Sequence, residues 1–269
     1  MIAGKLLMAA TLALAAQASQ AAVAAPPEGP AAPRAIDLAK AFNTRSPWMF
    51  TPLQGPDIVD PIMGEPDATA PGEIRMCISK DHGRTCSPVL DGALVVRGQR
   101  DTFSEAHYLN QARIVYPAAG KPMLLLQFGS LRSMNGDQRI ATVALAYDRT
   151  KDAFFVAYDR RTGHNNNQEV RYIAEGPLRG AILSAEPTEN APFGFWMTVN
   201  RIGPDNRYAE VLRYRSATRY GDGNPLAVID SEMPNLHRRL GFWRPGAPLP
   251  VPPGNCSKPH LVSGALWCR

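Results

Sequence analysis

Short segments with the character of β-strands follow one another along most of this chain, and they limit the possible folds more than any other feature. Clusters of Gly, Pro, Asp and Asn, as at 203–206 and 221–224, separate them and are strong turn signals. The apolar run PMLLLQF is typical of a strand buried on both faces. About twelve such segments are expected. They lie at 74–79, 85–90, 93–97, 112–116, 122–128, 139–147, 153–158, 168–173, 181–186, 193–201, 208–216 and 225–231.

Helical patterns are nearly missing from the same chain. Only residues 35–42 (AIDLAKAF) predict a helix, of about two turns. Because no amphipathic helices separate the strands, a parallel α/β sheet is excluded. The sequence therefore predicts an all-β domain with minimal helix. We expect a propeller or propeller-like set of antiparallel sheets, with a β-sandwich or barrel as the alternative.

The first 24 residues have the pattern of a secretory signal peptide. Lys5 supplies a positive charge, residues 6–16 form an apolar core, and Ala22-Val23-Ala24 has the form of a cleavage site. The apolar run is too short to span a bilayer as a helix. We therefore expect a secreted or periplasmic protein that is not integral to the membrane. Three further parts follow: a Pro- and Ala-rich lead-in at 25–34, an all-β domain at 35–255 and a disulfide-clipped loop at 256–269.

The charge of the chain is close to balanced. It carries 29 Lys and Arg against 24 Asp and Glu, a net charge of +5, and loss of Lys5 with the signal peptide leaves +5 − 1 = +4. Arginines occur singly or in pairs, with no longer basic run. We interpret this as ordinary solubility charge, and no nucleic-acid partner is expected.

Four cysteines in an exported chain predict disulfides. Cys77, Cys86, Cys256 and Cys268 allow three connectivities, and the sequence does not choose among them. We favour Cys77–Cys86 and Cys256–Cys268 because each bridge closes a short loop. A metal site is the rival interpretation, but no C-x-x-C or histidine at zinc-finger spacing accompanies either pair. No metal and no cofactor are predicted.

The stretch at 77–90, CISKDHGRTCSPVL, reads as a strand, a polar turn and a second strand. Ser79, Asp81, Gly83 and Thr85 match the pattern S-x-D-x-G-x-T, in which the Asp accepts backbone N–H bonds and Gly supplies a positive φ. In form this resembles the Asp-box, the hairpin repeat of sialidase-like β-propellers. The family has an aromatic residue, usually Trp, where this chain has Cys86. Cys77 and Cys86 are expected to face each other across the two strands.

The resemblance implies a propeller fold but no catalytic residues. Sialidase-like enzymes use an arginine triad, a Tyr–Glu nucleophile pair and an acidic proton donor. This chain lacks the Phe/Tyr-Arg-Ile-Pro motif that supplies the first arginine. The other roles have no motif by which to assign them.

The best candidate chemistry from the residues themselves lies at 213–232. Arg213 and Arg215 project to one face of a predicted strand and would clamp an anion. Asp230 and Glu232 share a face of the next predicted strand, about 6–7 Å apart, a separation suited to the acid and base of a glycosidase. The alternative is a set of cross-strand ion pairs on a solvated face.

Aromatic residues gather in the C-terminal third of the chain, where they are expected in the core, with stacking on sugars as the alternative. They are Phe193, Phe195, Trp196, Tyr208, Tyr214, Tyr220, Phe242 and Trp243. We expect a non-catalytic binding or scaffold role, toward glycans or another envelope protein, since repeat β-architectures offer broad loop faces. The alternatives are a sialidase-like glycoside hydrolase and a purely structural envelope protein.

Overall fold

The computed structural model describes residues 34–62, 67–163, 167–189, 193–252 and 256–269. The predicted signal peptide at 1–24 and all but the last residue of the lead-in at 25–34 lie outside the described residues. Within the described part of the chain, no helix has the length and apolar character needed to cross a membrane.

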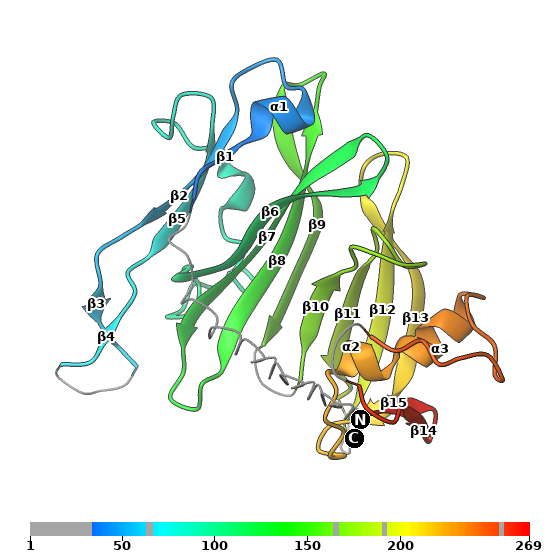
Figure 1. Ribbon diagram of the computed structural model, residues 1–269. Helices are drawn as coiled ribbons and strands as arrows, with labels where there is room; N and C mark the ends of the chain where they lie inside the picture. The colour runs from blue at the N-terminus through cyan, green and yellow to red at the C-terminus, as the bar shows by residue number, and fades with distance from the viewer. Residues whose placement is uncertain (1–33, 63–66, 164–166, 190–192, 253–255) are drawn as a thin grey trace, which may run out of the picture. The chain divides into compact units, whose positions relative to one another are not determined.

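The first large sheet is a meander of four antiparallel strands that follow one another in the chain (Figure 1). They are β6 (Tyr108–Ala118), β7 (Lys121–Arg132), β8 (Gln138–Asp148) and β9 (Ala153–Gly163). The predicted segments at 112–116, 122–128, 139–147 and 153–158 all fall within them. Strand β7 is buried along most of its length, as its continuous apolar run predicts.

The second large sheet is another four-stranded antiparallel meander (Figure 1). It consists of β10 (Glu169–Tyr172), β11 (Ile182–Pro187), β12 (Gly194–Ile202) and β13 (Tyr208–Arg219). The predicted turn at 203–206 joins β12 to β13. There the amide of Gly203 donates to the carbonyl of Arg207 at 2.7 Å, and Asn206 takes a φ of 60°.

Three smaller sheets complete the strands of the described residues. Strands β1 (Ile36–Asp37), β2 (Met49–Gln54) and β5 (Ile74–Ser79) form one, β3 (Ile58–Val59) and β4 (Thr69–Ala70) a second, and β14 (His260–Val262) and β15 (Ala265–Trp267) a third. The helices are short: α1 (Leu38–Phe42), α2 (Val228–Ser231), α3 (Met233–Arg239) and a 3-10 turn at Pro88–Leu90. The predicted helix at 35–42 thus begins at Leu38, where the carboxylate of Asp37 caps it.

The prediction of a strand at 225–231 is wrong, because α2 begins at Val228. Val228 and Ile229 are both buried against the β10–β13 sheet, and the carboxylate of Glu169 accepts the amide hydrogen of Ile229 in the first turn. A short apolar run does not distinguish a buried strand from a buried helical turn. The hydrogen bond that Glu169, far away in the sequence, accepts from Ile229 favours the helix.

The predictions of strands at 85–90 and 93–97 are also wrong. Ser87 makes one backbone bond to Ile78, and Pro88 then begins the 3-10 turn. A proline lacks the amide hydrogen that continued pairing with β5 would use. Further on, Gly92 and Arg97 take positive φ values, which break the extended conformation.

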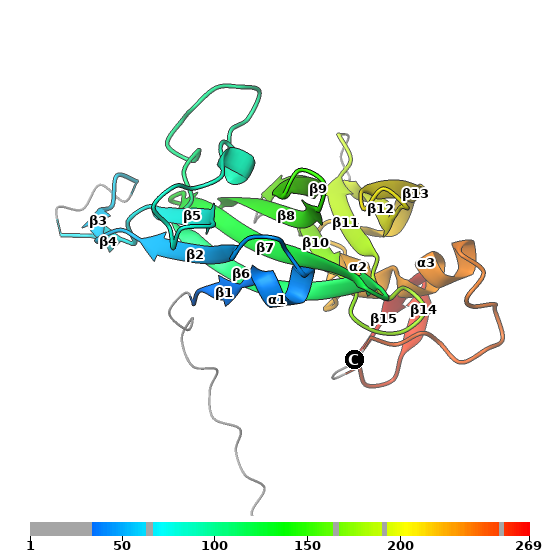
Figure 2. The same cartoon turned by 90° about the horizontal axis from the view of Figure 1, so that it is seen from above.

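Three apolar clusters form the core. The first lies between the β6–β9 sheet and α1, β2 and β5. The second lies between the β10–β13 sheet and helices α2 and α3, which both views place against that sheet (Figures 1 and 2). The third is shared by the two large sheets and joins Leu125 and Tyr158 of the first to Ile182 of the second. Each large sheet is therefore covered by apolar contacts on both faces.

The prediction of an all-β domain with minimal helix is confirmed by this arrangement. The two four-stranded antiparallel sheets are compatible with a propeller-like arrangement and with the sandwich alternative. Their two-residue side-chain alternation has a direct consequence for function. Along the strands β10–β13, neighbouring side chains point alternately to the helix-covered side and to the side that meets the β6–β9 sheet.

Candidate functional site

Glu232, one of the two predicted catalytic carboxylates, is completely buried on the helix-covered side. Its oxygens accept from the Tyr214 hydroxyl at 3.1 Å, the Ala217 amide at 2.9 Å and the Asn235 side-chain amide at 3.0 Å. They also accept from the amide and hydroxyl of Thr218, at 2.8 and 2.9 Å. Burial, reinforced by Glu232, raises the pKa of the Tyr214 hydroxyl. With five donors around it, Glu232 is a structural group.

Asp230, the other predicted carboxylate, points to a different place. It forms an ion pair with Arg171 of β10, which also pairs with Glu169 at 2.9 Å. Burial raises the pKa of Glu169, while Arg171 opposes the rise. Asp230 lies within α2 and Glu232 directly follows its last residue. Two residues apart on a helix, unlike on a strand, they do not share a face. The predicted acid–base pair is not assembled.

Arg213 and Arg215 do project from one face of β13, as alternation predicts. Arg213 pairs in register with Thr198, and Arg215 with Trp196. The residue between them, Tyr214, reaches Glu232, so the two arginines lie on the face opposite the helices. The Arg213 guanidinium stacks over the Trp196 ring, 4.7 Å from its centroid. The arginines and the predicted carboxylates are therefore on opposite sides of one sheet.

A third arginine joins this face from the other large sheet. Arg160 of β9 forms an ion pair with Glu186, and Glu186 pairs in register with Trp196. We call Arg160, Glu186, Trp196, Arg213 and Arg215 the arginine–tryptophan face. A second carboxylate, that of Glu210, also raises the pKa of Arg160 through its negative charge. Three guanidinium groups thus outnumber two carboxylates.

Two buried hydroxyl groups lie on the same side of the sheet, next to the arginine–tryptophan face. Ser184 is 1% exposed and Tyr158 is 9% exposed, and burial raises the pKa of the Tyr158 hydroxyl. The two lie close together, since Ser184 partly offsets that rise. By distance and angle, neither hydroxyl has a hydrogen-bond partner within the described part of the chain. Buried polar groups in this state are usually satisfied by a bound water or ligand.

The chemistry of the arginine–tryptophan face suits an anionic, ring-containing ligand. A guanidinium presents two parallel N–H groups that match a carboxylate. An indole offers a flat apolar surface on which a sugar or another ring stacks. Sequence reasoning found Arg213 and Arg215, and it expected Trp196 in the core with stacking on a sugar as the alternative. It missed Arg160 and Glu186, whose positions depend on how the two sheets pack.

The turn that resembles an Asp-box has the expected local bonds. The amide of Gly83 donates to the Ser79 hydroxyl at 2.7 Å, and the amide of Thr85 donates to the Asp81 carboxylate at 2.9 Å. Gly83 takes a φ of 87°. The bonds from Thr85 lower the pKa of Asp81. The turn is held by its own side chains.

Both predicted disulfides are confirmed, Cys77–Cys86 and Cys256–Cys268, each with a Cα–Cα distance of 5.0 Å. Cys77 lies on β5, but Cys86 lies on no strand, so the expected placement across two strands is wrong. The first bridge instead ties the turn at 79–85 to the end of β5.

One carboxylate attaches this turn to the β6–β9 sheet. Asp152, in the β8–β9 turn, forms an ion pair with Lys80 at 2.6 Å. It also accepts from Ser46, from the Trp48 indole at 3.0 Å and from the Tyr147 hydroxyl. These donors, Lys80 above all, lower the pKa of Asp152. The turn and the N-terminal segment are thus fixed at the same point.

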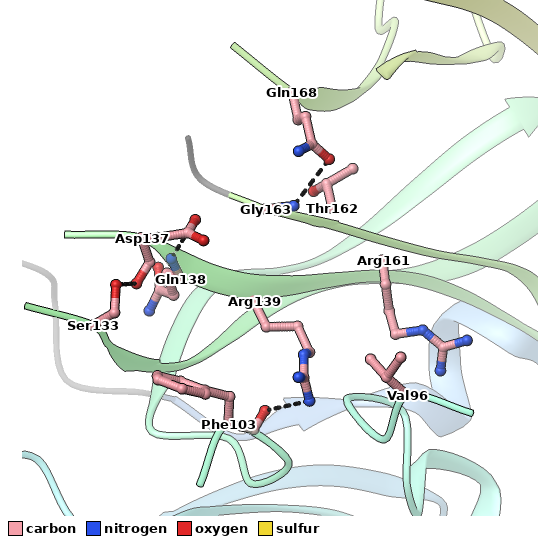
Figure 3. Close-up of a pocket in the computed structure, with 10 residues that line it drawn as sticks. All are labelled: Val96, Phe103, Ser133, Asp137, Gln138, Arg139, Arg161, Thr162, Gly163 and Gln168. Atoms are coloured by element: carbon pink, nitrogen blue, oxygen red, sulfur yellow. Dashed lines mark hydrogen bonds between the residues drawn. The ribbon is translucent and has the colours of Figure 1, made fainter. Parts of the chain in front are cut away.

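A pocket of ≈ 320 Å³ lies beside Arg139 and Arg161, where β8 begins and β9 ends (Figure 3). Arg139 donates to the carbonyls of Leu94 and Phe103, at 2.9 and 3.2 Å, and pairs with Asp101 at 2.8 Å. Arg161 donates to the carbonyl of Val95 at 2.7 Å. Both arginines hold the loop that replaces the predicted strand at 93–97, so we interpret this pocket as structural.

The Arg139–Asp101 pair gives stability a defined pH dependence. Arg139 lowers the pKa of Asp101 to about 2, from 3.8. A carboxylate with a lowered pKa stabilises the folded state above its unfolded pKa, and this contribution is lost as the pH falls through the folded value. We therefore expect the stability difference between wild type and Asp101→Asn, measured by urea unfolding, to shrink between pH 3.8 and about 2.

An exposed carboxylate supplies the control for this measurement. Asp67→Asn removes a charge at an exposed position outside the Arg139 pair. Its stability difference from wild type is expected to change less over the same pH window. If the Asp101→Asn difference near pH 2 equals that at neutral pH, the ion pair does not act as described.

No protein-family model matches the chain, and neither a curated protein nor a solved structure matches it significantly. Among the described residues, no group of three or more His, Cys, Asp or Glu is placed to hold a metal ion. The geometry of the sites is therefore the basis on which a function is proposed.

Proposed function

We propose that this protein is a non-catalytic binding protein whose arginine–tryptophan face recognises an acidic glycan. The observation that carries the proposal is the register of β12 and β13, which puts Arg213, Arg215 and Trp196 on one sheet face. Arg160 approaches the same face from the neighbouring sheet. Cationic side chains around an aromatic ring are the groups that a uronic or sialic acid residue requires.

Each group has a distinct role in the proposed complex. Arg213 and Arg215 are both exposed, so their guanidinium groups are free to bind a sugar carboxylate bidentately. Trp196 is half-buried and holds the Arg213 guanidinium over its ring, so a sugar carboxylate bound by Arg213 would lie beside the indole. The hydroxyls of Ser184 and Tyr158 are buried on the same side of the sheet, where a bridging water would satisfy them.

We also propose that the protein is exported and that the turn at 79–85 is a sialidase-like Asp-box. The two disulfides support export, since such bridges persist in oxidising compartments. The bonds of Ser79 and Asp81 to the backbone support the Asp-box proposal. An Asp-box is a structural turn, so it carries no argument for catalysis.

The glycoside hydrolase alternative has little support in the geometry. Glu232 is enclosed by five donors, Asp230 is paired with Arg171, and both lie across the sheet from Arg213 and Arg215. A purely structural envelope role remains the competing proposal. It predicts that the arginine–tryptophan face binds no glycan.

Binding to a glycan array tests the proposal. We expect the mature protein to bind oligosaccharides with uronic or sialic acid residues and not their neutral counterparts. Binding should weaken as salt rises, because exposed charges are screened. Trp196→Ala and the double variant Arg213→Gln/Arg215→Gln should each weaken binding at least about tenfold, equivalent to 1.4 kcal/mol. Titration with the best array ligand measures the change.

Arg238→Gln is the matched control, because it removes one exposed arginine from α3, on the other side of the sheet. It should bind as the wild type does. Absence of any acidic glycan ligand, or binding that survives Trp196→Ala and the double substitution, would overturn the proposal. Turnover of a fluorogenic glycoside would favour the hydrolase instead.

A further inference from the structure

A cleft of ≈ 750 Å³ lies on the helix-covered side of the β10–β13 sheet. Its walls are the end of β10 and the loop that follows it to Leu178, helices α2 and α3, and the segment Pro250 to Pro252. The arginine–tryptophan face is on the opposite side of the sheet, so the cleft is a separate feature. Its size lies within the range of small-molecule sites.

The body of the cleft is apolar. Ile173 and Leu178 come from the β10–β11 loop, Met233 from α3, and Val251 from the proline-rich segment. Leu178 belongs to the buried core beneath, while Val251 is 39% exposed at the surface. Apolar walls with few polar groups are typical of sites that bury most of a small ligand. The ligand must therefore have a largely apolar body.

The polar part of the cleft is acceptor-rich and carries excess negative charge. Asp230 and Arg171 line it, and Glu169 binds the same guanidinium, so two carboxylates share one cation. A third carboxylate, that of Glu175, also lines the cleft. Arg171 is the one Lys or Arg among the described residues that line the cleft, and it is already paired with two carboxylates. Arg201 donates to the carbonyl of Pro177 at 3.1 Å but does not itself line the cleft, so a carboxylate or phosphate entering here would face acids without an unpaired cation in the lining. A hydrogen-bond donor would instead find an acceptor in Asp230.

His237 lines the same cleft from α3 and adds no positive charge at neutral pH, because burial lowers its pKa. Its ring packs edge to face on Phe242, with centroids 6.1 Å apart. The imidazole makes no hydrogen bond within the described part of the chain. It therefore offers a second polar contact to a ligand.

We propose that this cleft binds a small apolar molecule with a hydrogen-bond-donating head group, an amine or a hydroxyl, and rejects the corresponding carboxylate. The apolar body lies between Met233 and Val251, and the head group donates to Asp230. The proposal is independent of glycan binding, because no residue of the arginine–tryptophan face lines the cleft.

The test compares two probes with the same ring system, 1-aminoanthracene and anthracene-1-carboxylate. We expect the mature protein to enhance the fluorescence of the amine saturably and to bind the carboxylate at least tenfold more weakly. Val251→Trp fills the cleft from its exposed edge and should weaken binding of the amine at least tenfold. Val262→Trp is the matched control, since Val262 is 41% exposed on β14 and does not line the cleft.

Two further variants test the role of Asp230 and the independence of the cleft from the arginine–tryptophan face. Asp230→Asn removes one of the three carboxylates, which lowers the excess negative charge, and should reduce the preference for the amine over the carboxylate. Trp196→Ala should leave binding of the amine unchanged, whatever it does to glycan binding. The proposal is overturned if the amine does not bind saturably, if the carboxylate binds equally well, or if Val251→Trp behaves like Val262→Trp.

Discussion

Replacing Glu232 by alanine is expected to lower the free energy of unfolding by about 4 kcal/mol, the scale of loss when a buried hydrogen-bond network is broken. The carboxylate accepts five hydrogen bonds, two of them from the backbone amides of Ala217 and Thr218. Alanine would leave the amides of Ala217 and Thr218 and the hydroxyl of Tyr214 without this acceptor, and each unsatisfied buried group costs about 1–3 kcal/mol. The lost hydrogen bonds are those that join the end of β13 to the start of α3.

Urea unfolding followed by circular dichroism measures this loss. Glu232→Gln should be intermediate, since it keeps the shape of the side chain but puts donors against donors. Glu175→Ala is the control, because that carboxylate is exposed, and its effect should stay within about 0.5 kcal/mol. A Glu232→Ala protein within about 1 kcal/mol of the wild type would show that the network contributes little.

The second large effect is expected at Gly180, where the two large sheets come into close contact. An added Cβ would lie 2.1 Å from the carbonyl oxygen of Pro117, on β6. The residue also has a φ of 79°, which costs an L-residue about 1–2 kcal/mol. Overpacking adds about 1–3 kcal/mol. We therefore expect Gly180→Ala to destabilise the protein by about 3 kcal/mol or more.

Gly176, in the same β10–β11 loop, separates the two causes. Its φ of 74° is nearly the same, but nothing lies within 4 Å of the position of an added Cβ. Gly176→Ala should cost only the backbone strain of about 1–2 kcal/mol. The difference between the two variants in thermal or urea unfolding then measures the contact of Gly180 with Pro117. Equal effects of the two substitutions would mean that Pro117 and residue 180 can move apart at little cost in stability.

Side-chain alternation was enough to predict much of the strand framework. The segments at 139–147 and 208–216 were placed correctly because an apolar or alternating pattern between strong turns has few other solutions. The errors have local causes. Pro88 stops the pairing that its neighbours favour, and the apolar run at 225–231 is helical because Glu169 supports its first turn.

The candidate site was partly predictable for the same reason. Arg213 and Arg215 are two residues apart on one strand, so their common face follows from sequence. Trp196 and Glu186 join them only through the pairing of three strands, and Arg160 only through the packing of two sheets. The burial of Glu232 depends on donors at 214–218 and 235, which no local pattern connects to it.

Strand β10 is four residues long, yet its side chains alternate between the two sides of the sheet. Val170 and Tyr172 contact the core shared by the large sheets, whereas Glu169 and Arg171 turn toward α2. A slip of one residue in its pairing with β11 would exchange these sets completely. It would bury a guanidinium among apolar side chains and at the same time remove the partner of Asp230. The ion pairs of Arg171 therefore help to fix the register of β10 on β11, because a shifted pairing would be unfavourable on both sides of the sheet.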